Sequence, residues 1–347
     1  MSSEHSLLQT MGLKAGYRSG SRKTVVIGAP LDLEIRAGQL ICLLGPNGSG
    51  KSTLLRTLAG LQPALEGGVQ IGGTGTERLT PLQLAKKVSL VLTDRVPGNN
   101  LTVYSLVALG RYPYSGWLGL LSDADKAAIR WAIEATAIAP LIHRKVHTLS
   151  DGESQKVMLA RALAQDTPIL MLDEPTAHLD LPSRIQLMQL LHRLARQTDK
   201  GILLSTHELD LALQVAGEVW LLQSGGQLNR GAPEDLVLNG IFEAAFVKEG
   251  IAFDKTTGTF TIHRGNMIPV SLEGAGAAAF WTGRALQRQG FAVTGDSTGI
   301  FSVRLSEGGG RTTWKLEDRQ SAGSIPAEEF GCIADLLRAL RARTEKS

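Results

Sequence analysis

The fold is indicated by one stretch of the sequence, LICLLGPNGSGKSTLL at residues 40–55. Its first five residues form an apolar run of the length of a buried strand, and its end has the apolar spacing of a helix. The turn between them matches the pattern G-x-x-x-x-G-K-[ST] in full. In such a loop the glycines let backbone N–H groups turn inward around phosphate oxygens, and the following helix points its positive dipole end at the same anion. The stretch therefore predicts a nucleotide phosphate site.

We expect the contacts of this loop to come from consecutive residues, namely Gly45, Pro46, Asn47, Gly48, Ser49, Gly50, Lys51, Ser52 and Thr53. Lys51 supplies a mobile positive charge to the β- and γ-phosphates, which also makes it a candidate catalytic residue, and the Ser52 hydroxyl is placed to bind Mg²⁺. The alternative is a chance lysine in a glycine-rich turn, but the flanking strand and helix argue against it.

A second half of the site follows a strand much later in the chain. Residues 169–172 are apolar and lead into Asp173-Glu174. Beside a phosphate-binding loop, Asp173 is the expected partner of the magnesium ion, and Glu174 can polarise a water for attack on the γ-phosphate. Two acids at a strand end can also be ordinary loop residues, and it is the phosphate-binding loop that argues against this alternative.

Length and composition set the broad class. The 347 residues, 43% of them hydrophobic, exclude disorder and suggest about two domains. The 36 basic and 33 acidic residues leave a net charge of +3, too small to indicate a nucleic-acid partner. Two distant cysteines, Cys42 and Cys332, predict neither a disulfide framework nor a zinc site, so we expect a reducing compartment. No apolar run reaches the roughly 18 residues of a membrane span, and no secretory signal is recognisable, so we expect a cytoplasmic protein.

Strands and helices alternate along the first two thirds of the chain. Further buried strands are expected at residues 88–92, 169–172 and 202–204, with long helices at residues 155–164 and 183–196. This alternation predicts an α/β fold with a largely parallel sheet.

The pattern changes near Gly250. Residues 251–253 and 259–262 flank a glycine turn and predict a β-hairpin. A strand at 270–272 and a helix at 277–288 follow, then short strands, and then a last helix expected to carry Phe330, Ile333, Leu337 and Leu340 on one face. This predicts a small separate α+β domain. Residues 274–279 (G-x-G-x-x-A) and Asp296 are spaced as in a dinucleotide site, but hairpins are expected to follow, so we favour a tight strand-to-helix turn.

Between the two halves of the phosphate site stands LSDGESQK, at residues 149–156. It resembles the signature motif of ATP-binding cassette (ABC) ATPases, usually LSGGQ, and the three motifs follow one another in that family's order. The resemblance covers about residues 6–248. It implies a P-loop NTPase ABC cassette at residues 1–248 with a helical subdomain at about 95–165, and an accessory C-terminal α+β domain at residues 249–347.

The resemblance implies that two copies form a homodimer that buries ATP and Mg²⁺ between them. The signature residues Ser150 and Gly152 then face the γ-phosphate held by the other copy, at the N-terminus of a helix. Carried over in register, Glu153 and Asp180 (in the family's D-loop) are nucleotide contacts. His207 resembles the switch histidine, a catalytic residue that contacts the γ-phosphate.

Tyr17 and Thr93 stand at two further positions that contact the nucleotide or the metal in the family. Tyr17 resembles the aromatic residue that stacks on adenine, although a tyrosine in a loop is more often a packing anchor. Thr93 stands where the family has a glutamine that touches Mg²⁺ and the attacking water. Thr93 is therefore a candidate metal contact through its hydroxyl, with Asp94 as the alternative, and the coupling to a membrane subunit is in doubt.

The signature itself also departs from the family pattern. Asp151 and Glu153 replace residues that are usually Gly and Gln, which puts two carboxylates near a phosphate site. Acids in the first turn of a helix favour its dipole. A carboxylate that faces the γ-phosphate, however, lowers the affinity for ATP because like charges repel.

One segment indicates a branch of the family. LTVYSLVALGRYPY at residues 101–114 resembles ATPases of bacterial importers for iron-siderophores, haem and cobalamin. In that group this region docks on the permease, and Tyr112, Tyr114 and Trp117 suit a docking patch as well as a core. The resemblance implies an ATP-hydrolysing subunit, peripheral on the cytoplasmic face of the bacterial inner membrane. It would power integral membrane permease subunits and serve a periplasmic substrate-binding protein indirectly.

The same fold also occurs in non-transport ABC ATPases of DNA repair or of the ribosome. Repair types insert a long coiled coil before the signature, and ribosome types carry two cassettes in one chain; this sequence has neither pattern. Co-purification with a polytopic membrane protein would separate the two interpretations. A third hypothesis concerns the C-terminal domain, as a ligand-sensing or dimer-clasping module rather than an enzyme.

Overall fold

The computed structural model describes residues 6–19, 23–92, 100–116, 119–223, 225–246, 251–262, 267–294, 299–308, 310–319 and 327–344. Thr93, Asp94, Trp117 and Asp296 lie outside the described residues. The chain divides into two compact units, residues 1–247 with 253–259 and residues 248–252 with 260–347. The assignment of separate roles to residues 1–248 and 249–347 stays a prediction.

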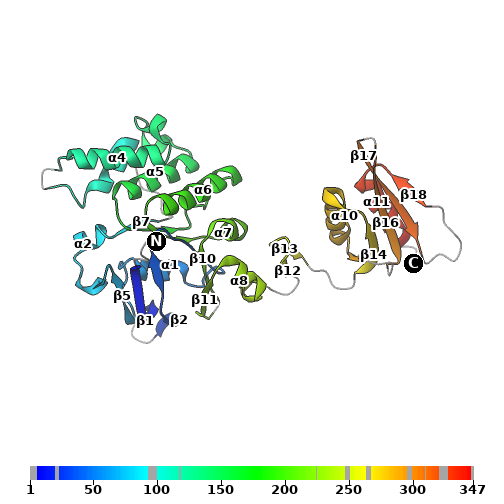
Figure 1. The fold of residues 1–347 in the computed structure, drawn as a ribbon, viewed down its shortest axis with the longest axis horizontal. Coiled ribbons are helices and arrows are strands. Elements are labelled where there is room, and N and C mark those ends of the chain that lie inside the picture. Colours follow the sequence, from blue (N-terminus) through cyan, green and yellow to red (C-terminus); the bar gives the residue numbers. More distant parts are fainter. Residues whose placement is uncertain are drawn as a thin grey trace. The chain divides into compact units, whose positions relative to one another are not determined.

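A six-stranded sheet forms the centre of the first unit (Figure 1). Its strands, in spatial order, are β11 (Leu228–Gly231), β10 (Glu218–Leu222), β4 (Leu40–Leu44), β9 (Gly201–Ser205), β8 (Ile169–Asp173) and β7 (Val88–Val91). All but the antiparallel edge strand β11 run parallel. Every residue of β4, β8 and β9 is buried, as apolar runs predict for strands covered on both faces. The predicted α/β fold is confirmed.

The first unit also holds an antiparallel sheet. It is built from β1 (Ser6–Ser19), β2 (Lys23–Leu31), β3 (Glu34–Arg36), β5 (Glu66–Ile71) and β6 (Thr74–Gly75). Helix α1 (Lys51–Leu58) shares a core with both sheets, because Leu54 of α1 packs in one cluster with Leu8 of β1 and Leu43 of β4. This burial fixes the helix whose first residue is the lysine of the phosphate-binding loop.

The other helices of the first unit connect the strands. They are α2 (Pro81–Ala85), α3 (Val103–Ala108), α4 (Asp123–Ala135), α5 (Asp151–Ala164), α6 (Leu181–Gln197), α7 (Leu209–Val215), α8 (Pro233–Leu238) and α9 (Ile241–Phe246), with 3-10 turns η1 (Thr76–Arg78), η2 (Leu109–Arg111), η3 (Ala139–Leu141) and η4 (Val146–Thr148). α4 and α5 lie together, away from β1, β2 and β5 (Figure 1). Among the described residues between the phosphate-binding loop and Ser150, no helix is longer than α4, with 13 residues, so no coiled coil occurs there.

Two helices begin earlier than their apolar periodicity indicates. α5 begins at Asp151 rather than Gln155, and α6 begins at Leu181 rather than Ser183. In each case the residue before the helix, Ser150 or Asp180, accepts a backbone N–H of the first turn through its side chain. Such capping extends a helix into polar sequence that carries no periodic signal.

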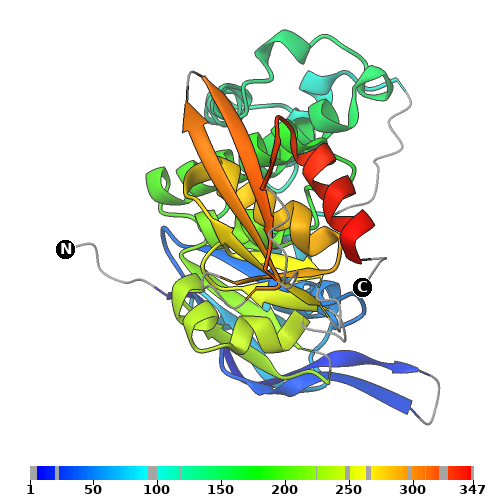
Figure 2. The same ribbon diagram turned by 90° about the vertical axis from the view of Figure 1, so that its right-hand side faces the viewer.

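The second unit is a five-stranded sheet with two helices. It contains β14 (Ile268–Glu273), α10 (Gly276–Arg288), β15 (Phe291–Thr294), β16 (Phe301–Gly308), β17 (Arg311–Asp318), β18 (Glu328–Phe330) and α11 (Ile333–Thr344), with strand order β15-β14-β16-β17-β18. Figure 2 shows the long β16–β17 hairpin in orange and α11 in red. Val303, Trp314 and Leu340 are in its apolar core. The predicted hairpin of β12 (Ile251–Asp254) and β13 (Thr259–Ile262) precedes this sheet in the sequence. The expected C-terminal α+β domain is present.

Two expectations about the tail are wrong. Phe330 is not on the last helix but ends β18, opposite Trp314 of β17. The elements after β14 are not all hairpins, because α10 carries the chain to β15, which pairs parallel to β14. At Gly274 a Cβ atom would lie 3.0 Å from the Cβ of Leu305, so close packing accounts for this glycine without a bound dinucleotide. None of the described helices has the length and hydropathy to cross a membrane.

A buried ion pair holds the helical region of the first unit together. Arg111 Nε donates to Asp125 Oδ1 at 2.8 Å, and the two side chains are 8% and 5% exposed. Arg111 Nη1 also donates to Ala164 O at 2.9 Å, at the end of α5, and its guanidinium lies 3.9 Å from the centre of the Tyr114 ring. The Ser122 hydroxyl and then Arg111 lower the pKa of Asp125 to about 2. One arginine thus joins η2, α4 and α5.

We predict that Asp125→Asn lowers the free energy of unfolding at pH 7 by about 3 kcal/mol, because it leaves Arg111 buried without a carboxylate. Urea unfolding measures the loss. Asp123→Asn is the matched control, since Asp123 is in the same helix turn and its side chain is 98% exposed. Because the folded-state pKa of Asp125 lies below 3.8, the contribution is present above about pH 4 and is lost as the pH falls toward 2. Equal losses in the two variants would contradict the assignment.

Candidate functional site

The phosphate-binding loop joins β4 to α1 and has a backbone that only glycine tolerates. Gly45, Gly48 and Gly50 have φ values of 154°, 77° and 103°. At Gly45 a Cβ atom would lie 2.2 Å from the backbone oxygen of Leu222, so no other residue fits. Ser49 Oγ is buried and has no hydrogen-bond partner among the residues that the structure describes. A buried hydroxyl without a partner, in a glycine loop at a helix N-terminus, fits a phosphate group.

Lys51 lies folded over this loop. Its side chain is buried, and Nζ donates to the backbone oxygens of Gly45 at 2.9 Å and Pro46 at 3.2 Å. Burial lowers the pKa of Lys51, while the carboxylates of Glu174 and Asp173 act in the opposite direction. The ammonium group therefore lies at the loop, and the two acids that the sequence placed in the same site favour its charged form.

Ser52 and Asp173 are brought together as predicted for a metal site. Ser52 Oγ donates to Asp173 Oδ1 at 3.1 Å, and Asp173 is 4% exposed at the end of β8. The described residues contain no group of three or more His, Cys, Asp and Glu side chains that could hold a metal by themselves. One hydroxyl and one carboxylate suit Mg²⁺, which commonly takes its other ligands from waters and nucleotide phosphates.

Glu174 and His207 also meet. His207 Nε2 lies 2.6 Å from Glu174 Oε1, although the two residues follow different strands, β9 and β8, and both side chains are partly exposed. Glu174 has a φ of 48°, a left-handed conformation that is strained for this residue type. Its backbone N–H donates to Ser205 O at 3.1 Å and to Ser205 Oγ at 2.9 Å. These contacts hold the strained residue with its carboxylate against His207.

The signature residues cap the N-terminus of helix α5. Ser150 Oγ accepts the backbone N–H of Glu153 at 3.2 Å, and Glu153 Oε2 accepts the backbone N–H of Ser150 at 2.8 Å. This reciprocal capping box leaves the proton of the Ser150 hydroxyl available to a ligand. A Cβ atom at Gly152 would lie 3.3 Å from Ser183 Oγ, and Asp180 Oδ1 accepts the backbone N–H of Ser183. Gly152 and Asp180 therefore both lie next to Ser183.

Known proteins match both units. The family model described as "ABC transporter" matches residues 29–177, and the one described as "Iron ABC transporter C-terminal domain" matches residues 268–341. The chain is 36% identical over 256 residues to an uncharacterized ABC transporter ATP-binding protein of Methanocaldococcus jannaschii, across 74% of this chain and 87% of the relative. This chain belongs to the ABC transporter ATP-binding proteins.

Further comparisons agree with that assignment. The chain is 34% identical over 239 residues to the iron(3+)-hydroxamate import ATP-binding protein FhuC of Bacillus subtilis, across 69% of this chain and 87% of the relative. The dimeric structure of a bacterial ABC transporter cassette superposes with a TM-score of 0.57 at 26% identity, across 65% of this chain and 99% of that chain. The protein is accordingly an ABC-type ATPase with a P-loop cassette, a helical subdomain and a C-terminal α+β domain.

Sequence reasoning missed Ser205, which links the two acids of this ABC ATPase. Ser205 Oγ donates to Asp173 Oδ1 at 2.6 Å and accepts the backbone N–H of Glu174 at 2.9 Å. The side chain is fully buried. A signal was available, since Ser205 is the one polar residue in the otherwise apolar strand 201–205 and comes two residues before His207. A buried serine at the carboxyl end of a parallel strand faces the ligand edge of the sheet.

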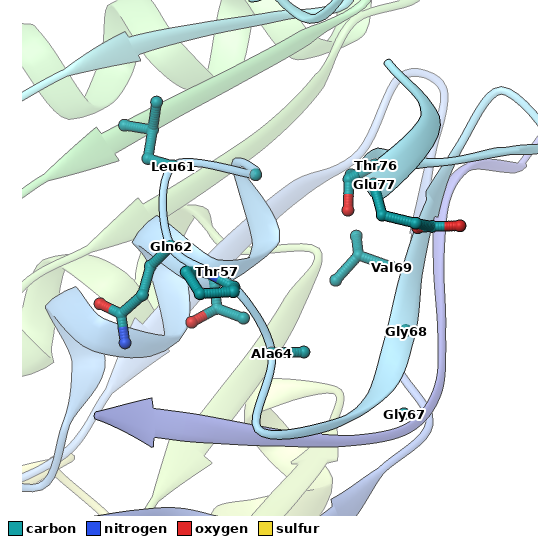
Figure 3. Close-up of a pocket in the computed structure, with 11 residues that line it drawn as sticks. Thr57, Leu61, Gln62, Ala64, Gly67, Gly68, Val69, Thr76 and Glu77 are labelled. Carbon is teal, nitrogen blue, oxygen red and sulfur yellow. The ribbon is translucent and has the colours of Figure 1, made fainter. Parts of the chain in front are cut away.

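Two sequence-predicted contacts, Tyr17 and Thr93, are not joined to the rest of the site by any hydrogen bond or ion pair in the described residues. Tyr17 is in β1 and 52% exposed, and its neighbour Gly16 accepts a hydrogen bond from the side chain of Gln62. Its role at adenine stays a prediction. Gln62 lines a hollow of about 400 Å³ between the loop after α1 and strand β5 (Figure 3). That hollow is distinct from the phosphate-binding loop. Thr93 lies outside the described residues, and its role at the metal also stays a prediction.

We predict that Ser205→Ala lowers the kcat of ATP hydrolysis by about 10- to 100-fold, because Asp173 and Glu174 lose the group that orients them. ATP affinity measured without Mg²⁺ should stay within about twofold, because the Ser205 side chain hydrogen-bonds Asp173 and the backbone of Glu174, which belong to the carboxylate half of the site. Ser89→Ala is the matched control. Ser89 is also buried, and its Oγ donates a hydrogen bond to Ile169 O at the other end of β8. Similar losses of kcat in both variants would show a general packing effect instead.

Proposed function

We propose that this chain is the ATP-hydrolysing subunit of a bacterial importer for an iron-siderophore, haem or cobalamin. The observation that carries the proposal is that one chain combines a complete phosphate and carboxylate site with a C-terminal region matching the "Iron ABC transporter C-terminal domain" at residues 268–341. A relative named as an iron(3+)-hydroxamate import ATP-binding protein, 34% identical over most of its length, supports the same cargo class.

The chemistry of the site follows from its residues. The loop N–H groups, Lys51 and Ser49 bind the phosphates, and Thr53, next to Ser52 in α1, completes the loop contacts. Ser52 and Asp173 would hold Mg²⁺, which supplies charge neutralisation at the phosphates when bound. Glu174 accepts a proton from the attacking water, and His207 keeps its carboxylate oriented. Catalysis is then positioning and electrostatic stabilisation, without a covalent enzyme intermediate.

A second copy completes the site in this proposal. Ser150 and Gly152 of one copy face the γ-phosphate held by Lys51 of the other, with Asp180 at the same interface. Ser150 is exposed, and the proton of its hydroxyl is not used by the capping box. The hydroxyl can therefore donate a hydrogen bond to a phosphate oxygen. ATP binding then closes the dimer and hydrolysis opens it, and the permease follows that movement.

The helical subdomain offers a surface for the permease. A groove of about 310 Å³ is lined by Tyr104, Ala108, Leu109 and Tyr112, together with Ser105, Arg111, Ser115, Gly119 and Leu121. Leu109 is 50% exposed and Tyr112 is 75% exposed, and both line this one groove, so they form an apolar patch of the kind that marks protein–protein contacts. We assign this groove to the permease, at the cytoplasmic face of the inner membrane. A periplasmic binding protein would deliver cargo without touching this chain.

We predict that Glu174→Gln keeps ATP binding but lowers the ATPase rate at least about 100-fold, because the general base is lost. ATP should then hold the variant as a dimer, which light scattering after size-exclusion chromatography measures. Lys51→Ala is the control and should neither bind ATP nor dimerise. An ATPase rate near that of the unchanged protein would remove Glu174 from this role.

We predict that the protein purified from its native membranes in mild detergent carries a polytopic membrane protein, identified by mass spectrometry. Tyr112→Glu should abolish this association, since it places a charge in the apolar groove. The control is Leu238→Glu, because Leu238 is 73% exposed on α8, which does not line the groove. Retention of the membrane protein by Tyr112→Glu would contradict the assignment of the groove, and absence of a membrane protein from the unchanged protein would contradict the transport assignment.

A further inference from the structure

The acidic signature poses an electrostatic problem. Asp151 and Glu153 both lie in the first turn of α5, beside the serine that the proposed function places against a γ-phosphate. Carboxylates so close in sequence to Ser150 oppose the binding of a highly charged anion there, because like charges repel. The hydrogen bonds and the ion pair of Glu153 show how its negative charge is compensated.

Both oxygens of Glu153 are engaged on the protein side. Oε2 accepts the backbone N–H of Ser150 at 2.8 Å, and Oε1 accepts Arg144 Nη1 at 2.8 Å. The Ser150 N–H and then the charge of Arg144 hold the pKa of Glu153 below its usual value, so the group is ionised at neutral pH. Its negative charge is therefore paired with a guanidinium at the same helix start.

Arg144 reaches the signature from a second side as well. Its Nη2 donates to the backbone oxygen of Thr148, two residues before Ser150. The backbone oxygen of Arg144 accepts the N–H of Val103 at 3.0 Å, and Val146 N–H donates to Leu101 O at 3.0 Å. The segment that carries Arg144 is thus held against the start of α3, and Arg144 ties the signature to that anchored segment.

We propose that Arg144 is a positioning residue of the shared ATP site, one that holds the Ser150 hydroxyl in place through Glu153 and Thr148. Its positive charge also offsets Glu153, so that an acidic signature still accepts the γ-phosphate bound to a second copy. This inference rests on the proposed function. It makes Arg144 and Glu153 a matched pair: the arginine is needed because the signature carries a glutamate.

A double-mutant cycle in the Glu174→Gln background tests the pairing. The measurement is the ATP concentration that gives half-maximal dimer, at about 0.05 M and about 0.3 M salt. Arg144→Gln should raise that concentration about tenfold at low salt and less at high salt, because unpaired Glu153 repels the phosphate and salt screens the repulsion. Glu153→Gln should change that concentration less than Arg144→Gln does, since glutamine completes the same capping box and leaves no carboxylate at this position.

The double variant with both glutamines should return to within about threefold of the background, because no unpaired carboxylate remains at position 153. Arg130→Gln is the matched control for the loss of one positive charge, since Arg130 is exposed on α4, and it should leave the dimer unchanged. A purely structural role of Arg144 would lower the thermal midpoint without this salt dependence and without rescue.

Three results would overturn the inference: Arg144→Gln indistinguishable from the background, the double variant as weak as Arg144→Gln, or an effect of Arg144→Gln that salt does not change. If Arg144→Gln does not fold, Arg144→Lys decides. Lysine keeps the charge but cannot bridge Glu153 and Thr148 at once, so Arg144→Lys should weaken ATP-dependent dimer formation by an amount that salt does not change, and an unweakened dimer would overturn the inference. If the Glu174→Gln protein itself forms no ATP-dependent dimer, the proposed function fails and this inference fails with it. If that protein dimerises but the cycle fails, the proposed function stands and only the role of Arg144 falls.

Discussion

The hydrogen bond from Ser205 Oγ to Asp173 Oδ1, 2.6 Å long, is the contact on which the site depends. It joins the carboxyl ends of two neighbouring parallel strands, and the same serine accepts the backbone N–H of Glu174. Asp173 is thereby held against Ser52 of the phosphate-binding loop, and Glu174 is held against His207. Because the strands are fully buried, the sheet can hold these polar groups with little freedom.

In the helical part of the first unit, arginines join polar segments to helices. Arg111 does this in the interior, where it joins α4 and α5 through Asp125 and Ala164 O. Arg144 does it at the surface, where it joins Glu153 to Thr148 O. In both places an arginine bridges a carboxylate and a backbone oxygen, and its planar array of donors suits that double role.

The tail shows where periodicity misleads. Its short strands alternate in the way that hairpins do, yet β15 pairs parallel to β14 because α10 returns the chain to the same edge of the sheet. Phe330 follows the apolar spacing of α11, yet it ends β18 and pairs with Trp314. Spacing alone does not say where a helix begins, and here the chain turns between Phe330 and Ile333.

Local pattern was enough for the phosphate-binding loop, the acids at the end of β8 and the parallel sheet, because glycine geometry and strand burial constrain contiguous residues. The resemblance to ABC ATPases, rather than local pattern, pointed to His207 and to the signature, each close to a recognisable element. Ser205 meets Asp173 across 32 residues, and Arg144 meets Glu153 across a turn without periodicity. Such partners are chosen by strand order and by capped helix ends, so they emerge only when the chain is folded.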